Sequence, residues 1–336
     1  LAVAGFRTDW PQDPNNPIFS PQPNGFGAVK TNLAIIKIPF ALAYQVSERL
    51  SIGGAIDLFQ GSLAISPLPP AVPDCTLGDP ATGVTRDCFY ADADNTVTSY
   101  AVSLQLGVHF QVNERWSLGA SYTTAQDYDD YEWNSSIALP YLRQGDGSTI
   151  VNPDFGRGRT IRYALDGAAI ASVGAAYRHS ERLQIGVDVR FIEYTSVDGA
   201  GGVGGFKPDG SLNEIGWDDI WVGAIGVEYH ASERLTLRGG FNYGETPIRE
   251  AVVFTSLGTP PTFEQHYTFG LGLQLTDAVR LDVGAYYVPE NSISGPVLNP
   301  NLVPNPTTIA EQTVPGATFT LSEELRSVLF AFNFQF

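Results

Sequence analysis

The chain has 336 residues with a formal net charge of −17, and 43% of its residues are hydrophobic. This acidic balance argues against a nucleic-acid-binding protein, which needs a basic face. No stretch reaches the roughly 18–20 continuous apolar residues of a membrane helix, whereas a transmembrane strand needs only about 9–11 residues, of which every second one is apolar.

A strand–turn–strand pattern recurs along the chain. In each copy, two segments of alternating apolar residues flank a tight polar turn that contains Ser, Asn or Thr near Glu or Asp. A side-chain period of two indicates β-strands, so each copy is predicted to be a β-hairpin. The copies span 43–55, 109–122, 176–189, 228–243 and 273–287. No second layer of apolar elements is evident that would cover such a sheet in water. We therefore expect an antiparallel up-and-down β-barrel that closes in lipid.

Turn residues divide the chain into about 12 strands, which form one all-β domain over residues 1–336. The expected strands cover 1–8, 31–46, 50–63, 97–112, 116–128, 160–178, 183–195, 217–230, 235–245, 263–275, 280–288 and 325–336. The turns inside the hairpins are short, whereas the other connections are long and rich in Gly, Pro, Asp and Asn. Short turns on one rim and long loops on the other are typical of bacterial outer-membrane barrels, whose short turns face the periplasm.

Cys75 and Cys88 are the two cysteines of the chain, and both lie in the long connection 64–96. The loop between them is short and no His lies nearby to complete a metal site, which favours a disulfide, with free thiols as the alternative. A disulfide would place this loop in an oxidising compartment, either the periplasm or the cell exterior.

Two apolar loop segments, 62–73 and 294–306, are rich in proline. They are expected either to form a hydrophobic funnel at the loop end of the barrel or to act as rigid spacers.

Strand parity separates residues that face lipid from residues that face the lumen. On 235–243, alternate apolar side chains face lipid, which turns Arg238 inward. The same reasoning turns inward Lys37, Asp57, His109, Arg162, Asp166, Asp188, Arg190, Asn242 and Asp282. One interpretation is a mutual ion-pair network that fills the lumen. The other is that Arg238, Arg190, Arg162 or Lys37 binds the carboxylate of an otherwise hydrophobic ligand.

The last segment, 325–336, is an alternating aromatic strand. One of its faces carries Val328, Phe330, Phe332, Phe334 and Phe336. Such a strand exposed to water would aggregate, so we expect this face to contact lipid, with Phe336 at the interface. A C-terminal aromatic residue resembles the sorting signal of outer-membrane barrels, and a buried strand of a soluble sandwich is the alternative.

Side chains that would support catalysis are sparse. The four histidines are His109, His179, His230 and His266, and the sequence contains neither a Gly-x-Ser-x-Gly element nor a metal-ligand spacing. We therefore expect no enzyme, no metal site and no cofactor.

Several longer segments carry a family resemblance. They are LAVAGFRTDWP, GFGAVKTNLAIIKIPFALAYQVSERLSIGGAIDLFQGSLAISPLPP, ERWSLGASYTT, YDDYEWNS, GWDDIWVGAIGVEYHASERLTLRGGFNYGETPI and EQHYTFGLGLQLTD. Together they resemble the OmpP1/FadL/TodX family of outer-membrane transporters for long-chain fatty acids and other hydrophobic compounds. The most specific pieces are PFALAYQVSERLSIG and GWDDIW with LTLRGGFNYGETPI.

The resemblance implies a monomeric barrel of about 14 strands with an N-terminal hatch. It also implies that a long-chain fatty acid or similar hydrophobic molecule enters from outside and leaves sideways into the membrane. Residues 1–10 resemble the third strand of the family, so the hatch and first hairpin are expected to be missing from this sequence. The expected surroundings are outer-membrane lipid and lipopolysaccharide. A structural or receptor barrel within a larger envelope assembly is the alternative.

Overall fold

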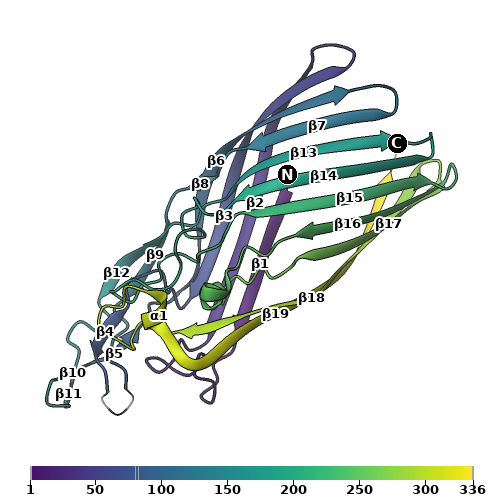
Figure 1. Cartoon of the computed structure of the whole chain (residues 1–336). Helices are drawn as coiled ribbons and strands as arrows, with labels where there is room; N and C mark the ends of the chain where they lie inside the picture. The colour runs from purple at the N-terminus through teal and green to yellow at the C-terminus, as the bar shows by residue number, and fades with distance from the viewer. Residues whose placement is uncertain (1, 80, 82, 335–336) are drawn as a thin grey trace.

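The computed structural model describes residues 2–79, 81 and 83–334. Its main feature is one large antiparallel sheet whose strands follow chain order and curve around a common interior (Figure 1). In spatial order the sheet contains β1 (Ala2–Trp10), β2 (Val29–Gln45), β3 (Leu50–Ser66), β6 (Ala93–Gln111), β7 (Trp116–Thr123), β13 (Ala169–Arg178), β14 (Leu183–Glu193), β15 (Ile220–His230), β16 (Leu235–Gly244), β17 (Gln265–Thr276), β18 (Val279–Leu298) and β19 (Thr313–Phe334). The short β8 (Asp127–Tyr128) also pairs with β6. The predicted all-β fold of up-and-down neighbours is confirmed. Over the described residues, β1 and β19 form no backbone pairs with each other.

All the predicted hairpins are present, and their short turns lie at the end of the sheet opposite the long loops (Figure 1). Side-chain oxygens hold these turns. The hydroxyl of Ser47 accepts hydrogen bonds from the backbone N–H groups of Arg49 and Leu50, at 3.3 and 3.1 Å. Asn113, Ser180 and Ser232 make the same pair of bonds in their turns. This bonding explains why Ser and Asn recur there.

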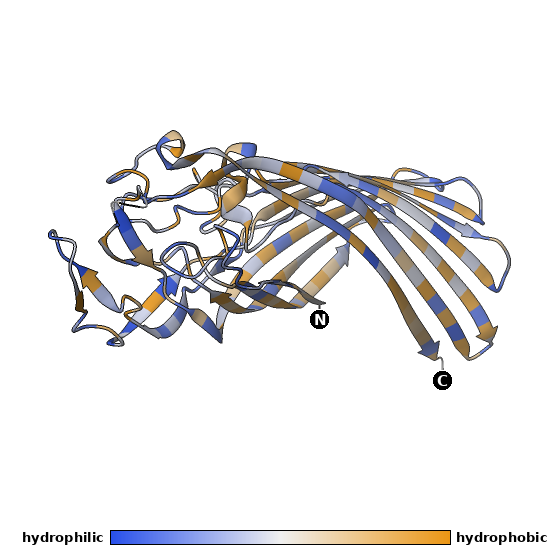
Figure 2. Ribbon diagram, turned by 90° about the horizontal axis from the view of Figure 1, so that it is seen from below, coloured by the Kyte–Doolittle hydropathy of each residue, from blue (hydrophilic) through white to orange (hydrophobic). Residues whose placement is uncertain are grey.

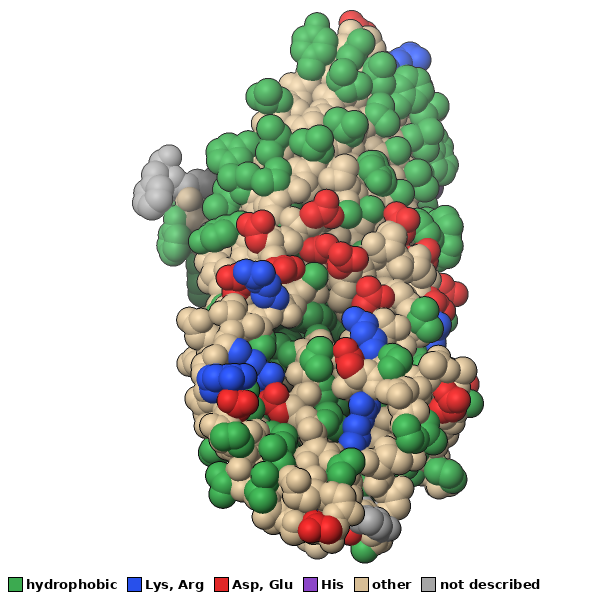
Figure 3. Space-filling view, turned by 90° about the vertical axis from the view of Figure 1, so that its left-hand side faces the viewer, with side chains coloured by type: hydrophobic (Ala, Val, Ile, Leu, Met, Phe, Trp, Pro, Cys, Tyr) green, Lys and Arg blue, Asp and Glu red, His purple; other side chains and the backbone are tan. Residues whose placement is uncertain are grey.

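Hydrophilic and hydrophobic residues alternate along the strands of the large sheet (Figure 2). Many of the apolar side chains on these strands are exposed. Leu42 is 85% exposed and Phe330 is 69% exposed, values that a water-soluble sheet would not tolerate over many strands. Figure 3 shows hydrophobic side chains over the upper part of the visible face and acidic side chains gathered beneath them. The pattern fits lipid on the outside, as predicted for the last strand. Phe336 lies outside the described residues.

The long connections contain more structure than predicted. Three small sheets form there, from β4 (Asp74–Leu77) with β5 (Arg86–Phe89), β9 (Tyr131–Ser136) with β12 (Gly158–Tyr163), and β10 (Tyr141–Arg143) with β11 (Thr149–Val151). The connections also contain the short helices η1 (Glu250–Ser256) and α1 (Ile309–Gln312). Neither helix of the described chain has the length and hydropathy needed to cross a membrane.

Some of the predicted strand bounds are wrong. The single strand predicted over 160–178 is interrupted at 164–168, because β12 pairs with β9 in the loops while β13 belongs to the large sheet. The strands predicted to end at 288 and to begin at 325 are longer, since β18 and β19 continue to pair through the bulges near Pro289 and Pro296.

The buried core lies at the loop end. One cluster of buried side chains joins loops to η1 and β19 and includes Phe206, Phe254 and Phe319. A second cluster joins Leu63 of β3 to Tyr131 and Trp133 of β9. The loops therefore fold over one end of the barrel as a packed cap, and the candidate site lies beneath it.

Candidate hydrophobic-ligand site

An apolar cavity of about 80 Å³ lies where the cap meets the inner face of the first strands. We call it the apolar chamber. Its barrel wall includes Phe6, Val29, Thr31, Leu63 and Ile65, and its cap wall includes Phe26, Phe206, Leu212, Ile215, Phe254 and Leu257. Among its lining residues in the described part of the chain, none carries a charge. The lining therefore suits contact with an apolar molecule and offers no ionic partner.

Strand pairing explains which residues form the barrel wall of the chamber. Phe6 lies opposite Leu33, and Leu33 lies opposite Leu63, so these residues of β1, β2 and β3 share the inner face. Leu63 is completely buried and Val29 nearly so. Side chains alternate between the two faces along the whole length of these strands. Near the cap the inward-facing residues are apolar, whereas lower in the barrel the lipid-facing residues are apolar.

A second cavity, of about 1300 Å³, lies between the loop ends of β1 and β19, and we call it the outer cavity. It shares Phe26, Phe254 and Leu257 with the apolar chamber, so these three side chains form the partition between the two spaces. The ring of Phe26 lies 5.8 Å from that of Phe254 and 6.4 Å from that of Phe206. Unlike the chamber, the outer cavity has charged residues in its lining, including Arg7 and Arg86.

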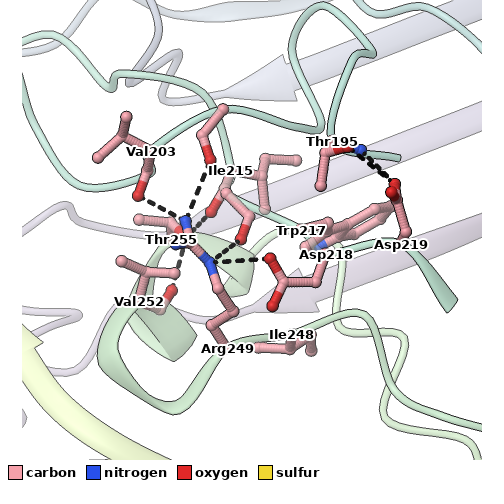
Figure 4. A network of polar contacts seen from close by, with 12 residues as sticks. Thr195, Val203, Ile215, Trp217, Asp218, Asp219, Ile248, Arg249, Val252 and Thr255 are labelled. Atoms are coloured by element: carbon pink, nitrogen blue, oxygen red, sulfur yellow. Dashed lines mark hydrogen bonds and ion pairs between the residues drawn. The ribbon is translucent and has the colours of Figure 1, made fainter. Parts of the chain in front are cut away.

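Arg249 fixes the wall of the chamber that η1 and the glycine-rich loop 199–216 form (Figure 4). Its guanidinium donates to the backbone oxygens of Gly216 at 2.7 Å and Val203 at 2.6 Å, and lies 3.6 Å from the carboxylate of Asp218. Thr255 of η1 adds a hydrogen bond from its hydroxyl to the backbone oxygen of Ile215. Because the loop carbonyls accept charge-assisted bonds from one side chain, these contacts join the loop and the helix into one wall.

The cations singled out in the sequence all have carboxylate partners. The pairs are Lys37–Asp57 at 2.7 Å, Arg162–Glu132 at 2.5 Å, Arg190–Asp188 at 3.2 Å and Arg238–Glu228 at 2.7 Å. Arg162 lies on β12 in the loops and is 63% exposed, rather than in the barrel lumen. None of the four cations lines the apolar chamber, as far as the described residues define it. This geometry favours the ion-pair network, and binding of a carboxylate by these residues stays a prediction.

The predicted disulfide between Cys75 and Cys88 is present and joins β4 to β5. This hairpin borders the outer cavity through Arg86, whose guanidinium donates to Asn301 Oδ1 at 2.8 Å and to the backbone oxygen of Pro208 at 2.9 Å. Burial raises the pKa of the neighbouring Asp87. The disulfide thus secures a hairpin that ties two other loops to the rim of the outer cavity.

Both proline-rich segments that the sequence singled out contribute to cavity walls. Segment 62–73 supplies Leu63 and Ile65 to the apolar chamber, and 294–306 supplies Val297 to the outer cavity. Sequence reasoning missed Phe26, Phe206 and the wall held by Arg249, although the glycine run at 199–205 signals an unusual backbone there. No cluster of three or more His, Cys, Asp or Glu side chains suited to a metal occurs over residues 2–79, 81 and 83–334.

Comparisons with known proteins agree with this architecture. A family model described as outer membrane protein transport protein (OMPP1/FadL/TodX) matches residues 16–336. Outer membrane protein P1 of Haemophilus influenzae is 22% identical over 277 residues, which cover 77% of this chain and 56% of that protein. This chain therefore spans little more than half the length of that relative.

Solved structures show the same fold. The toluene transporter TodX of Pseudomonas putida matches with a TM-score of 0.66 at 16% identity, covering 99% of this chain and 77% of that one. A FadL homologue of Pseudomonas aeruginosa matches with a TM-score of 0.64 at 16% identity, covering 98% and 73%. The toluene transporter TbuX of Ralstonia pickettii matches with a TM-score of 0.55 at 15% identity, covering 91% and 69%.

Proposed function

The chain belongs to the OMPP1/FadL/TodX family of outer membrane transport proteins, and we propose that it takes up compact, neutral hydrophobic molecules through the apolar chamber. Single-ring aromatic hydrocarbons are the substrates that we consider first. The family is one of transport proteins rather than enzymes, so the task of the chain's residues is to bind and to pass on a molecule without changing it.

The observation that carries this proposal is the uncharged lining of the apolar chamber. Each buried methylene of a ligand there retains about 0.8 kcal/mol of transfer free energy. An ionised carboxylate moved into the same space without a partner would cost several kcal/mol. Proteins of similar structure include toluene transporters and a monoaromatic hydrocarbon channel, which supports the same class of ligand.

The two adjoining cavities support a route. A hydrophobic molecule would first enter the outer cavity and then pass the partition of Phe26, Phe254 and Leu257 into the chamber. We propose that it leaves sideways through the barrel wall near β1, because this exit avoids transfer of the ligand into water.

A long-chain fatty acid is the second candidate substrate. The outer cavity has room for an alkyl tail, and Arg7 in its lining is an exposed cation that could meet a carboxylate. Arg7 is bonded to Asp9 at 3.0 Å, so a fatty acid would have to displace that partner.

Uptake measurements test the proposal. The protein is expressed in a bacterial host that has an outer membrane and lacks transporters for toluene and for oleate. The initial uptake of labelled toluene and of labelled oleate is then compared with that of the same host without the protein. We expect faster uptake of toluene and unchanged uptake of oleate. Faster uptake of oleate alone would favour the fatty acid, and no gain with either would favour a structural or receptor barrel.

A further inference from the structure

The side chain of Gln312 is bound to the backbone of Phe206, a residue 106 positions away. Its Nε2 donates to the backbone oxygen of Phe206 at 2.8 Å, and its Oε1 accepts from the backbone N–H of Phe206 at 2.8 Å. Gln312 is only 2% exposed. The amide therefore pairs with both polar groups of one residue in a buried setting, where an unmade hydrogen bond is costly.

Gln312 occupies a rigid position. It ends α1, whose first turn is closed by a capping box between Thr308 and Glu311. Its own backbone oxygen accepts from Asn299 at 2.7 Å, and β19 begins at the next residue. A side chain held between a capped helix and a long barrel strand has little freedom to follow a moving loop.

The loop that carries Phe206 packs directly on α1 and η1. Gly204 and Gly205 both have a φ of +74°, which favours glycine. A Cβ at Gly205 would overlap Ile309 of α1, and one at Gly204 would lie 3.0 Å from Val252 of η1. The backbone that directly precedes Phe206 is therefore packed closely against η1 and α1.

The ring of Phe206 lines the apolar chamber and stacks with Phe26 of the partition. The chamber, at about 80 Å³, is smaller than the apolar cavity of about 150 Å³ that is known to take benzene in another protein. A ligand must therefore displace part of the lining, and the backbone bonds of Gln312 oppose displacement of the Phe206 wall.

We propose that Gln312 is a positioning residue for substrate selectivity, which holds Phe206 as a fixed wall of the apolar chamber and so limits entry to compact hydrophobic molecules. The inference rests on the proposed uptake of neutral hydrophobic molecules. It adds that the size limit for substrates is set by Gln312, a residue that does not itself line the apolar chamber.

The test compares the uptake of naphthalene with that of toluene in wild type and in Gln312→Met, which keeps the side-chain length but removes both hydrogen bonds. We expect the naphthalene-to-toluene ratio to rise about three- to tenfold, which corresponds to the net contribution of about one hydrogen bond. The matched control is Gln126→Met. The amide of Gln126 also binds loop backbone, at Thr124 and Ala168, but Gln126 lines neither cavity. Its ratio should equal that of wild type.

Two further measurements test the inference if Gln312→Met does not assemble or if no hydrocarbon is transported. Phe206→Ala changes the wall itself and should raise the same ratio, so it replaces Gln312→Met if that variant does not assemble. Hydrogen exchange of the Phe206 amide should accelerate in Gln312→Met whether or not any hydrocarbon is transported. An unchanged ratio in a wild type that transports toluene, or an unchanged exchange rate, would overturn the inference. Absence of toluene uptake by the wild type would instead count against the proposed function.

Discussion

Lys37 and Asp57 form an ion pair of 2.7 Å on the inner wall of the barrel, in which the Asp57 carboxylate is completely buried. The Lys37 ammonium also lies 5.5 Å from the centre of the Phe59 ring. Across the strands, Asp57 lies opposite Ser103, whose buried hydroxyl has no hydrogen-bond partner within the described chain. Lys37 therefore neutralises a buried charge, and its role as a ligand anchor would require it to leave Asp57.

Removal of Lys37 should destabilise the barrel. Lys37→Leu leaves the Asp57 charge buried without a partner, and we expect a loss of about 3–5 kcal/mol in the free energy of unfolding. The double variant with Asp57→Leu should recover most of that loss. Denaturant unfolding of barrels in lipid vesicles measures both values. Arg7→Leu, which removes an exposed pair with Asp9, is the control and should cost less than about 1 kcal/mol. A similar cost for both single variants would show that the buried pair has no special role.

Arg238→Gln and Arg190→Gln separate the two substrate classes. Both arginines are bonded to carboxylates outside the lining of the apolar chamber, so we expect toluene uptake to stay within about twofold of wild type. Oleate binding to the purified variants is the complementary measurement. A loss of oleate affinity of about tenfold or more would support a carboxylate anchor at these residues.

Loss of the disulfide should loosen the rim of the outer cavity without unfolding the barrel. A bond that closes a loop of this length contributes about 3 kcal/mol in the chain-entropy model, and Cys75→Ser with Cys88→Ser removes it. We expect faster proteolysis within residues 74–89 and an unchanged heat-induced gel shift of the barrel. Wild type under reducing conditions is the control and should match the double variant. Detection of free thiols at both cysteines in the non-reduced wild type would contradict this expectation.

We expect Asp166 to make the stability of the cap depend on pH. Burial raises the pKa of its carboxyl, with a further increase from Asp127, Asp198 and Asp130, although the backbone N–H of Tyr128 opposes the shift. A raised pKa in the folded state means that the ionised form is disfavoured there. Asp166→Asn should therefore raise the unfolding temperature at pH 7, and this gain should shrink as the pH falls through the raised pKa toward the ordinary value near 3.8. A gain that is equal at pH 7 and at pH 3.5 would show that the cause is not ionisation.

The strands of the barrel wall could be predicted because the patterns that specify them lie in neighbouring residues of the sequence. Alternation fixes which side of each strand meets lipid, and turn residues such as Ser47 and Asn113 supply their own hydrogen-bond acceptors. The error at 160–178 arose because Tyr163 and Ala169 belong to similar alternating segments that pair with different partners. Periodicity identifies strands but does not identify their neighbours.

The apolar chamber was only partly predictable. The segment 62–73 had two interpretations, a hydrophobic funnel or a rigid spacer, and its Leu63 and Ile65 line the chamber. Phe26, Phe206 and Phe254 come together from loops far apart in the chain, and no local pattern signals that convergence. The hydrogen bonds that hold them, from Gln312 and Arg249, are contacts between distant segments.

Filling the apolar chamber tests most directly whether it is the route for hydrophobic molecules. Ile65→Trp adds a large ring to the chamber lining, and Ile56→Trp adds the same ring to the lipid-facing side of the same strand, where Ile56 is exposed. We expect Ile65→Trp to reduce toluene uptake at least about tenfold and Ile56→Trp to leave it near the wild-type rate, with both variants assembled to the same level. Equal uptake by the two variants would contradict a route through the chamber.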